Sequence, residues 1–271
     1  MTQADKAMSP AAGDLYAKFE KGTGTPIVFL NSLAADHSMW NDVAKRLQGR
    51  TMLRYDARGH GRSAVYTVDC TAEDLGHDLL ALMDAKGIDR AVLCGLSLGG
   101  STAMWIAGAA PDRVAGLVLA NTATSFPPAS MWEDRAAKAR EEGMRGIADA
   151  TIGRWLTETF RNAAHSKTQE VLDMIVATPP EGYAACCMAL AGLDVSDALA
   201  AYDGPALVIA GRHDQSTPLA RAKEMKTLCP QADIVELDAA HLSSVETPSE
   251  FATCLDGFMR LVETRETARA G

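Results

Sequence analysis

The sequence predicts an α/β fold in which a mostly parallel central sheet is flanked by helices. Six short runs are apolar almost throughout, a pattern typical of strands that are buried on both faces. Helical patterns separate these runs, and regular alternation of strand and helix indicates a sheet built from right-handed crossovers. The chain has 271 residues and is 47% hydrophobic, so it can bury a sizeable core.

The six predicted strands lie toward the two ends of the chain, and none falls between residues 122 and 200. They are "PIVFLN" (26–31), "TMLRYD" (51–56), "AVLCG" (91–95), "VAGLVLAN" (114–121), "PALVIAG" (205–211) and "ADIVEL" (232–237). Apolar residues recur at helical spacing before Gly49 and again before Gly87, where a glycine suits a helix C-cap. These residues are Trp40, Val43 and Leu47 for the first helix and Leu75, Leu79, Leu82 and Met83 for the second.

Residues 122–200 predict an inserted helical cap, or lid, between the two parts of one α/β core, residues 1–121 and 201–271. Helical segments follow one another there without a strand-like run. One of these helices is predicted to begin at Ser166, with Gln169 in the position of a capping box. The sequence contains no internal repeats.

Composition excludes several kinds of partner. The net charge of -9 and the absence of a dense Lys/Arg stripe disfavour nucleic acid as a partner. No apolar run approaches the roughly 20 residues that cross a bilayer, so no membrane partner is expected. The six cysteines form no C-x-x-C pair and the N-terminus shows no apolar leader region, so we expect buried free thiols and a cytoplasmic protein.

Ser97 lies between Gly95 and Gly99, where a predicted strand gives way to a predicted helix. A serine hydroxyl is a weak nucleophile unless it projects clear of the backbone and lies within reach of a base. A sharp turn from strand to helix provides this projection, and the G-x-S-x-G pattern of such a turn is known as a nucleophile elbow. The pattern alone also fits a glycine-rich turn capped by a serine, so the rest of the chain has to supply the partners.

Asp214 and His241 are the predicted partners of Ser97. Each follows the end of a predicted strand, and they come in the order serine, acid, histidine that this architecture uses. We therefore predict Ser97 as nucleophile, His241 as general base and Asp214 as the group that orients the imidazole. His213 is a weaker choice because its neighbour Asp214 faces the site, and His60 is expected to make a structural hydrogen bond. No His, Cys and Asp cluster has metal-ligand spacing, so neither a metal nor a cofactor is expected.

Acyl transfer also needs backbone N–H donors for the oxyanion that forms at the carbonyl. One donor should be Leu98, the residue after the nucleophile. The second should come from the loop "LNSLAADHSMW" after the first of the six strands, where Leu33 is the first choice and Ser32 the alternative.

The chain resembles the 3-oxoadipate enol-lactone hydrolases of the α/β-hydrolase superfamily over nearly its whole length. The matching segments, in order, are "NSLAADHSMW", "LRYDARGHGRS", "CGLSLGG", "ATPPEGYAACCMAL" and "ELDAAHLSSVETP". The resemblance implies an α/β-hydrolase fold and assigns the family's triad to Ser97, Asp214 and His241. It implies a small five-membered enol-lactone with a carboxymethyl group as substrate and 3-oxoadipate as product, in the catabolism of aromatic compounds through protocatechuate or catechol. Leu98 departs from the family pattern, which has methionine there.

A substrate that carries a carboxylate should meet a cation in the cap. Arg135 with Trp132 is the first choice, because a guanidinium can bind a carboxylate through two hydrogen bonds while an indole walls the pocket. Arg154 with Trp155 is the second choice. In the alternative interpretation, the tryptophans belong to the cap core and the arginines to a solvated face.

Two other functions stay open at this point. The first is a carboxylesterase or thioesterase for another small substrate, with the same triad and a pocket for longer acyl groups. The second is a ligand receptor that keeps the fold without turnover. A dehalogenase or epoxide hydrolase is disfavoured, because those chemistries place a carboxylate where Ser97 stands. The sequence leaves the oligomeric state open, a homo-oligomer included.

Overall fold

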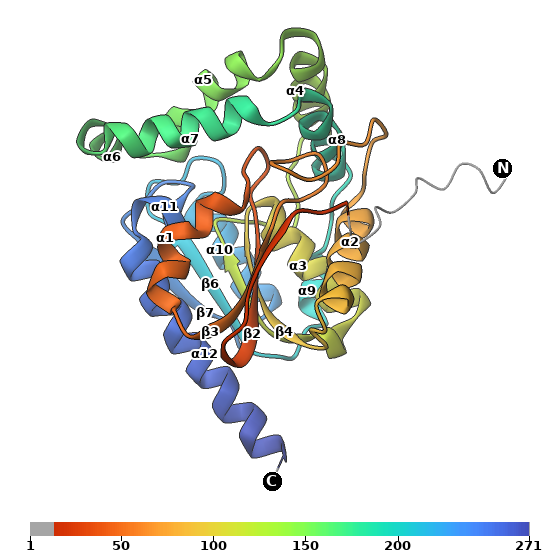
Figure 1. Cartoon of the computed structure of the whole chain (residues 1–271), viewed down its shortest axis with the longest axis vertical. Coiled ribbons are helices and arrows are strands. Elements are labelled where there is room, and N and C mark those ends of the chain that lie inside the picture. The colour runs from red at the N-terminus through yellow and green to blue at the C-terminus, as the bar shows by residue number, and fades with distance from the viewer. Residues whose placement is uncertain (1–13, 271) are drawn as a thin grey trace, which may run out of the picture.

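The computed structural model describes residues 14–270 and shows a seven-stranded sheet between two layers of helices, with a further group of helices above one end of the strands (Figure 1). The strand order is β1-β3-β2-β4-β5-β6-β7. The strands are β1 (Ala17–Glu20), β2 (Thr23–Leu30), β3 (Arg50–Tyr55), β4 (Ala91–Leu96), β5 (Val114–Ala120), β6 (Ala206–Gly211) and β7 (Asp233–Leu237). This arrangement confirms the predicted α/β fold with a mostly parallel sheet.

Neighbouring strands pair in parallel except at β1, which pairs antiparallel with β3 and places Ala17 opposite Tyr55. The sequence-based prediction missed β1 because its four residues are only partly buried at the sheet edge and form no apolar run. The six strands that were predicted are all present, and their ends shift by at most three residues. The apolar pattern therefore predicted the six more buried strands and missed the short strand at the sheet edge.

Side chains of the central strands alternate between two apolar layers. Ile27 and Phe29 join the core on one face of the sheet, whereas Val28 and Leu30 join the core on the other face. The first layer contains α1 (Asn41–Ala44), α11 (Ser243–Glu246) and α12 (Pro248–Ala270), and the second contains α2 (Ala72–Ala85), α3 (Leu98–Ala109), α9 (Ser196–Ala200) and α10 (Leu219–Leu228). Within the part of the chain that the structure describes, no helix is both long and apolar enough to cross a membrane.

The first predicted helix is broken, whereas the second is continuous. The broken segment consists of the 3₁₀ turn His37–Trp40, α1 and the 3₁₀ turn Lys45–Leu47. The ring of Trp40 is fully buried and lies 5.0 Å from that of Phe29, so tertiary packing of this indole anchors the segment to the sheet. The second helix, α2, begins with a capping box in which Thr71 is the N-cap, a signal the prediction did not use.

Five helices form the cap above the carboxyl ends of the strands (Figure 1). They are α4 (Ala129–Glu142), α5 (Met144–Trp155), α6 (Glu158–Ala163), α7 (His165–Ala177) and α8 (Pro180–Ala191). Helix α4 packs against α8, and α5 packs against α7. The domain boundaries at 122 and 200 stay a prediction, and α9, which lies inside this range, packs against α3 and α10 of the core.

The helix start predicted at Ser166 is wrong. Helix α7 begins at His165 with Ala164 as its N-cap, and no side chain caps it. Ser166 therefore lies inside the first turn, where its hydroxyl cannot take the N-cap position that a capping box requires. Gln169 donates from Nε2 to Asp173 Oδ1 at 2.7 Å instead of reaching back along the helix.

The cap rests on the core at a contact between two glycines. Gly59 lies in the loop after β3 with φ at +70°, and Gly182 lies near the start of α8. A Cβ atom added to Gly182 would lie 2.4 Å from Cα of Gly59, and one added to Gly59 would lie 2.3 Å from Cα of Gly182. Arg140 of α4 forms an ion pair with Asp69 of the core nearby, at 2.8 Å. The two backbones thus touch where no larger residue fits.

Candidate active site

Ser97 occupies the sharp turn between β4 and α3, with φ at 55° and ψ at −117°. Few residues other than glycine adopt this conformation, so the surrounding structure has to hold the serine in place. Its N–H donates to the carbonyl of Ala120 at 3.0 Å, and its carbonyl accepts from Thr122 Oγ1 at 2.6 Å. The turn is anchored on both sides and presents the side chain of Ser97 to a cavity.

The glycines on each side of Ser97 are required by close backbone contacts. A Cβ on Gly95 would lie 2.3 Å from the carbonyl oxygen of Gly99. A Cβ on Gly99 would lie 2.3 Å from the carbonyl oxygen of Leu30 in β2. The pattern that identified the turn in the sequence is therefore explained by the approach of helix α3 to the strands.

His241 and Asp214 lie in the loops after β7 and β6, and they are hydrogen-bonded to each other. His241 Nδ1 is 2.8 Å from Asp214 Oδ2, and both side chains are buried. Because Nδ1 faces the carboxylate, the neutral ring carries its proton there and leaves Nε2 as the acceptor. Ser97 and His241 line the same cavity, and Asp214 lies behind His241.

Asp214 is held as a carboxylate. Burial raises its pKa, but the charge of His241 and hydrogen bonds from His241 and Thr217 outweigh burial and lower the pKa to about 2. Oδ1 accepts from the backbone N–H groups of Ser216 and Thr217 at 2.7 and 3.0 Å. A charged, fully hydrogen-bonded Asp214 can both orient the imidazole and stabilise an imidazolium.

Two residues of this network were missed in the sequence. Asn121 Nδ2 donates to Asp214 Oδ2 at 2.9 Å, and Thr217 Oγ1 donates to the same oxygen at 2.6 Å. Asn121 follows β5 with φ at 44°, at the sheet edge that also carries Ser97 and His241. The signal that could have revealed Asn121 is a polar residue placed directly after a buried strand.

The loop after β2 forms a tight turn beside Ser97. The N–H of Ala35 donates to the carbonyl of Ser32 at 3.1 Å, and Ala34 has φ at 62°. The N–H of Ala34 donates to His60 Nε2 at 3.0 Å, which confirms the structural role expected for His60. Burial lowers the pKa of His60, so its ring stays neutral and can accept this bond. With Ala34 and Ala35 engaged, Ser32 and Leu33 are the residues of this turn that line the cavity.

The cavity has a volume of about 170 Å³, and the core and the cap each supply part of its wall. Helix α4 contributes Trp132 and Arg135, and the end of α5 contributes Arg154 and Trp155. The ring of Trp155 lies 6.0 Å from that of His241. The structure therefore brings together the two pairs of cap residues, Leu33, Ser97 and His241 in one cavity. Leu98 follows Ser97 as the first residue of α3.

The two arginines of the cavity lie close enough to repel each other. Arg135 donates from Nε to the hydroxyl of Tyr183 at 2.8 Å, and its guanidinium lies 5.0 Å from the ring of Trp132. Partial burial and repulsion from Arg135 lower the pKa of Arg154. Within residues 14–270, neither arginine forms an ion pair. The cap wall thus presents positive charge to the cavity.

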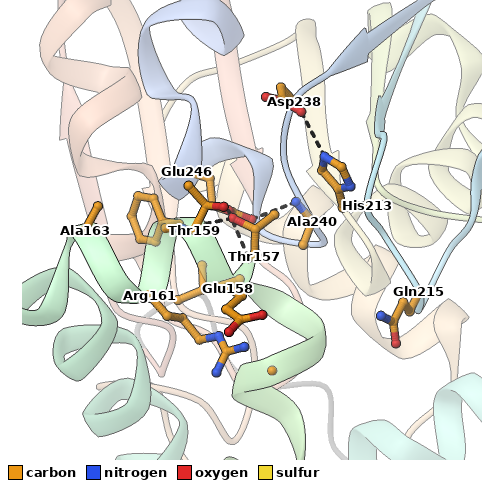
Figure 2. Close-up of a pocket in the computed structure, with 13 residues that line it drawn as sticks. Thr157, Glu158, Thr159, Arg161, Ala163, His213, Gln215, Asp238, Ala240 and Glu246 are labelled. Atoms are coloured by element: carbon orange, nitrogen blue, oxygen red, sulfur yellow. Dashed lines mark hydrogen bonds and ion pairs between the residues drawn. The ribbon is translucent and has the colours of Figure 1, made fainter.

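His213 lies outside this cavity, as expected from its neighbour Asp214. Its Nε2 is 2.9 Å from Asp238 Oδ1 in an outer groove beside α6 (Figure 2). Elsewhere among the described residues, one group of side chains, Asp36, His37 and Asp56, has the atoms and spacing to hold a metal ion. Asp56 already accepts from the N–H of His37 at 2.7 Å and lies 2.8 Å from its Nδ1, so this group is internally paired.

Known proteins of similar sequence and structure share this fold. A family model described as alpha/beta hydrolase fold matches residues 25–248. The 3-oxoadipate enol-lactonase 1 of Acinetobacter baylyi is 34% identical over 240 residues, which cover 88% of this chain and 89% of that protein. The enol-lactonase from Burkholderia xenovorans, a crystal structure, is 37% identical with a TM-score of 0.88 and covers 91% of this chain and 96% of that one.

An esterase lies at a similar structural distance. The thermophilic esterase from Thermogutta terrifontis, with malate bound, is 30% identical with a TM-score of 0.88 and covers 92% of this chain and 94% of that one. The fold, the strained serine turn and these matches lead to one assignment. The chain belongs to the α/β-hydrolase fold family and, within it, to the carboxylic ester hydrolases that include the 3-oxoadipate enol-lactonases.

Proposed function

We propose that this chain hydrolyses 3-oxoadipate enol-lactone to 3-oxoadipate by a Ser97, His241 and Asp214 triad, in cytoplasmic catabolism of aromatic compounds. The similarity to enol-lactonases over about nine-tenths of the chain supports the substrate class. The hydrogen bond between His241 and Asp214, in a cavity shared with Ser97, supports the triad. The chemistry needs no metal or cofactor.

The proposed reaction is acyl transfer through an acyl-enzyme. His241 Nε2 takes the hydroxyl proton of Ser97 while Oγ attacks the lactone carbonyl, and the backbone N–H groups of Leu98 and Leu33 bind the oxyanion. The ring C–O bond breaks, the leaving enolate takes the proton from His241, and the enol becomes the ketone. Water, deprotonated by His241, then attacks the ester of Ser97; the bond from the acyl carbon to Oγ breaks, Oγ takes the proton back from His241, and the product leaves with its second carboxylate.

The observation that carries this proposal is the size and charge of the cavity. About 170 Å³ is small compared with the roughly 300–1,000 Å³ of pockets for drug-sized ligands, so the cavity suits a short substrate. Arg135 and Arg154 line it together with Ser97, and a substrate carboxylate between the two arginines would relieve their mutual repulsion. The lactone has both required groups, an ester for Ser97 and a carboxylate for the arginines, while Trp132 and Trp155 wall the ring.

The test is loss of ultraviolet absorbance of freshly generated 3-oxoadipate enol-lactone. Fast turnover is expected for the wild-type protein and loss of turnover for Ser97→Ala, since the nucleophile is gone. Ser249→Ala, a serine at the start of α12 away from the cavity, is the matched control and should keep wild-type rates. A folded wild-type protein that leaves the lactone intact would refute the substrate assignment.

A second candidate function is hydrolysis of another small ester or thioester. The similarity to the Thermogutta terrifontis esterase favours it. A series of aryl esters from acetate to octanoate separates the two functions, because a cavity of this size should reject the long chains. Rates that rise with chain length would favour the esterase.

A further inference from the structure

Glu246 joins the loop of His241 to the cap. It ends the short helix α11, five residues after His241. Its Oε1 accepts from the N–H of Ala240 at 2.7 Å, and its Oε2 accepts from the N–H and Oγ1 of Thr157 at 3.1 and 2.7 Å. Figure 2 shows this carboxylate between Ala240 of the core and Thr157 of the cap. One side chain therefore binds both parts of the molecule.

A second link lies on the other side of His241. The N–H of Leu242 donates to the carbonyl of Trp155 at 3.0 Å. Trp155 is the last residue of α5, and Thr157 is the N-cap of α6 and accepts from the N–H of Phe160. The N–H groups of Ala240 and Leu242 are thus both connected to the segment that joins α5 to α6, the first through Glu246 and the second directly.

This segment also carries side chains of the cavity wall. Arg154 and Trp155 line the cavity, and Thr157 lies two residues further along the chain. The bonds of Glu246 and Leu242 connect residues 155–157 to the backbone on each side of His241. His241 Nδ1 is held by Asp214 at 2.8 Å, so the position of this backbone helps to set the direction in which Nε2 points.

We infer that Glu246 is a positioning residue, which couples the α5–α6 segment of the cap to the orientation of His241. The inference rests on the proposed role of His241 as general base. Glu246 is not among the residues that line the cavity of Ser97, so it acts through the backbone of Ala240. Misplacement of a reacting group by about 1 Å can lower a rate by roughly 100-fold, which sets the scale of the effect.

The experiment compares Glu246→Ala, Glu246→Gln and Glu158→Gln with the wild-type protein. Glu158 is exposed and lines the same groove without bonding to Ala240, so it is the matched control for charge (Figure 2). Glutamine can accept a hydrogen bond either from Ala240 or from Thr157 but not from both, because its amide nitrogen is itself a donor and would face the donor groups of the other residue. With p-nitrophenyl acetate, we expect Glu246→Ala to lower kcat roughly 10- to 100-fold with KM within about 2-fold, and Glu246→Gln to fall between.

A double-variant test examines the link to the cap. Thr157→Val removes the hydroxyl donor and leaves the N–H of Thr157, so it should lower kcat less than Glu246→Ala. Once Glu246 is alanine, the hydroxyl has lost its partner. The double variant should therefore be no slower than Glu246→Ala alone, and additive losses would contradict a shared pathway.

A proton NMR measurement gives a readout that does not depend on turnover. The Nδ1 proton of His241, bonded to Asp214, should give a low-field resonance in the wild-type protein and in Glu158→Gln. This resonance should shift or broaden in Glu246→Ala. An unchanged resonance and unchanged kcat, with only a lower melting temperature, would show a purely structural role and overturn the inference. If the lactone is not hydrolysed, the ester kinetics and the resonance still decide the role of Glu246.

Discussion

The cavity has a core wall, which carries Ser97 and His241 with Asp214 behind it, and a cap wall, which carries Arg135 and Arg154. The two walls differ in how completely their polar groups are hydrogen-bonded or ion-paired. On the core side, Asp214 accepts five hydrogen bonds, and the turn of Ser97 is anchored at its N–H and its carbonyl. On the cap side, Arg135 bonds to the neutral hydroxyl of Tyr183, and Arg154 forms no ion pair within residues 14–270. The hydrogen bonds that hold Asp214 and the turn of Ser97 are in place without a ligand, whereas the cap wall has charge that a ligand can still pair.

This difference separates two tasks. A wall whose dipoles and hydrogen bonds are already in place needs no rearrangement during the reaction, which favours rate. A wall with unpaired cations gains most when an anion arrives, which favours selective binding. Changes to the core wall should therefore act on kcat, and changes to the cap wall should act on KM for anionic substrates.

Asp214→Asn should produce the largest effect and would break the core wall. Asparagine presents an amide nitrogen where Asp214 accepts hydrogen bonds at both oxygens, so it disfavours the tautomer of His241 that leaves Nε2 free. We expect kcat to fall roughly 10,000-fold with KM little changed. Steady-state kinetics on the lactone and on an aryl ester measure this, and a loss below tenfold on both would show that Asp214 is not needed.

Replacement of Arg135 or Arg154 should produce the second-largest effect and would test whether the cap wall binds an anionic substrate. Arg154→Met or Arg135→Met removes a charge-assisted hydrogen bond worth about 1.5–3 kcal/mol, so KM for the anionic lactone should rise roughly 10- to 100-fold. Neutral p-nitrophenyl acetate should keep its KM. Arg145→Met is the matched control. Arg145 lies on α5, as Arg154 does, but it is exposed and forms an ion pair with Asp149. Equal losses on the neutral and anionic substrates would contradict a carboxylate site.

Acid should weaken the core wall through Asp214. Its pKa is about 2 in the folded chain and about 3.9 in an unfolded one, so the charged form stabilises the fold by about 2 to 3 kcal/mol. Because the folded pKa is the lower one, this stabilisation is present above about pH 4 and is lost as the pH falls toward 2. Denaturant unfolding at pH 5 and pH 2.5 should show a smaller loss for Asp214→Asn than for the wild-type protein. Equal losses would mean that Asp214 is not held as described.

The smallest expected effect concerns the strain at Ser97. Its φ of 55° and ψ of −117° suit glycine far better than alanine. Ser97→Gly should therefore be more stable than Ser97→Ala by about 1 kcal/mol, while both lack turnover. Thermal unfolding of the two variants checks this, and an alanine variant as stable as the glycine one would show that the turn relaxes.

The sequence was most informative where the local backbone geometry requires one residue type, as the turn at Ser97 requires glycine on each side. The turn at Ser97 was predictable from its glycines, and the proximity of Asp214 and His241 from their positions after buried strands. The hydrogen-bond partners of Asn121 and Glu246 could not be predicted, because they depend on how loops far apart in the chain meet. Strand β1 escaped because partial burial leaves no apolar run, and the start of α7 was wrong because a short capping pattern can fall inside a turn.

The cap residues also show that the sequence alone does not predict how separate helices pack together. The sequence separated Arg135 with Trp132 from Arg154 with Trp155 as first and second choices, but the structure lines one cavity with both pairs. Helical spacing alone could not place α4 and α5 relative to each other. Binding of the substrate carboxylate by both arginines stays a prediction, which the KM values of Arg135→Met and Arg154→Met test.

The contact between Gly59 and Gly182 limits how this protein can be re-engineered. A chimera that places another protein's cap on this core must have glycine at the position of Gly182, or the foreign helix will stand off from the loop of Gly59. Directed evolution of substrate range should therefore vary the inner faces of α4 and α5 and leave both glycines unchanged. This close backbone contact thus limits which part of the cap is open to exchange.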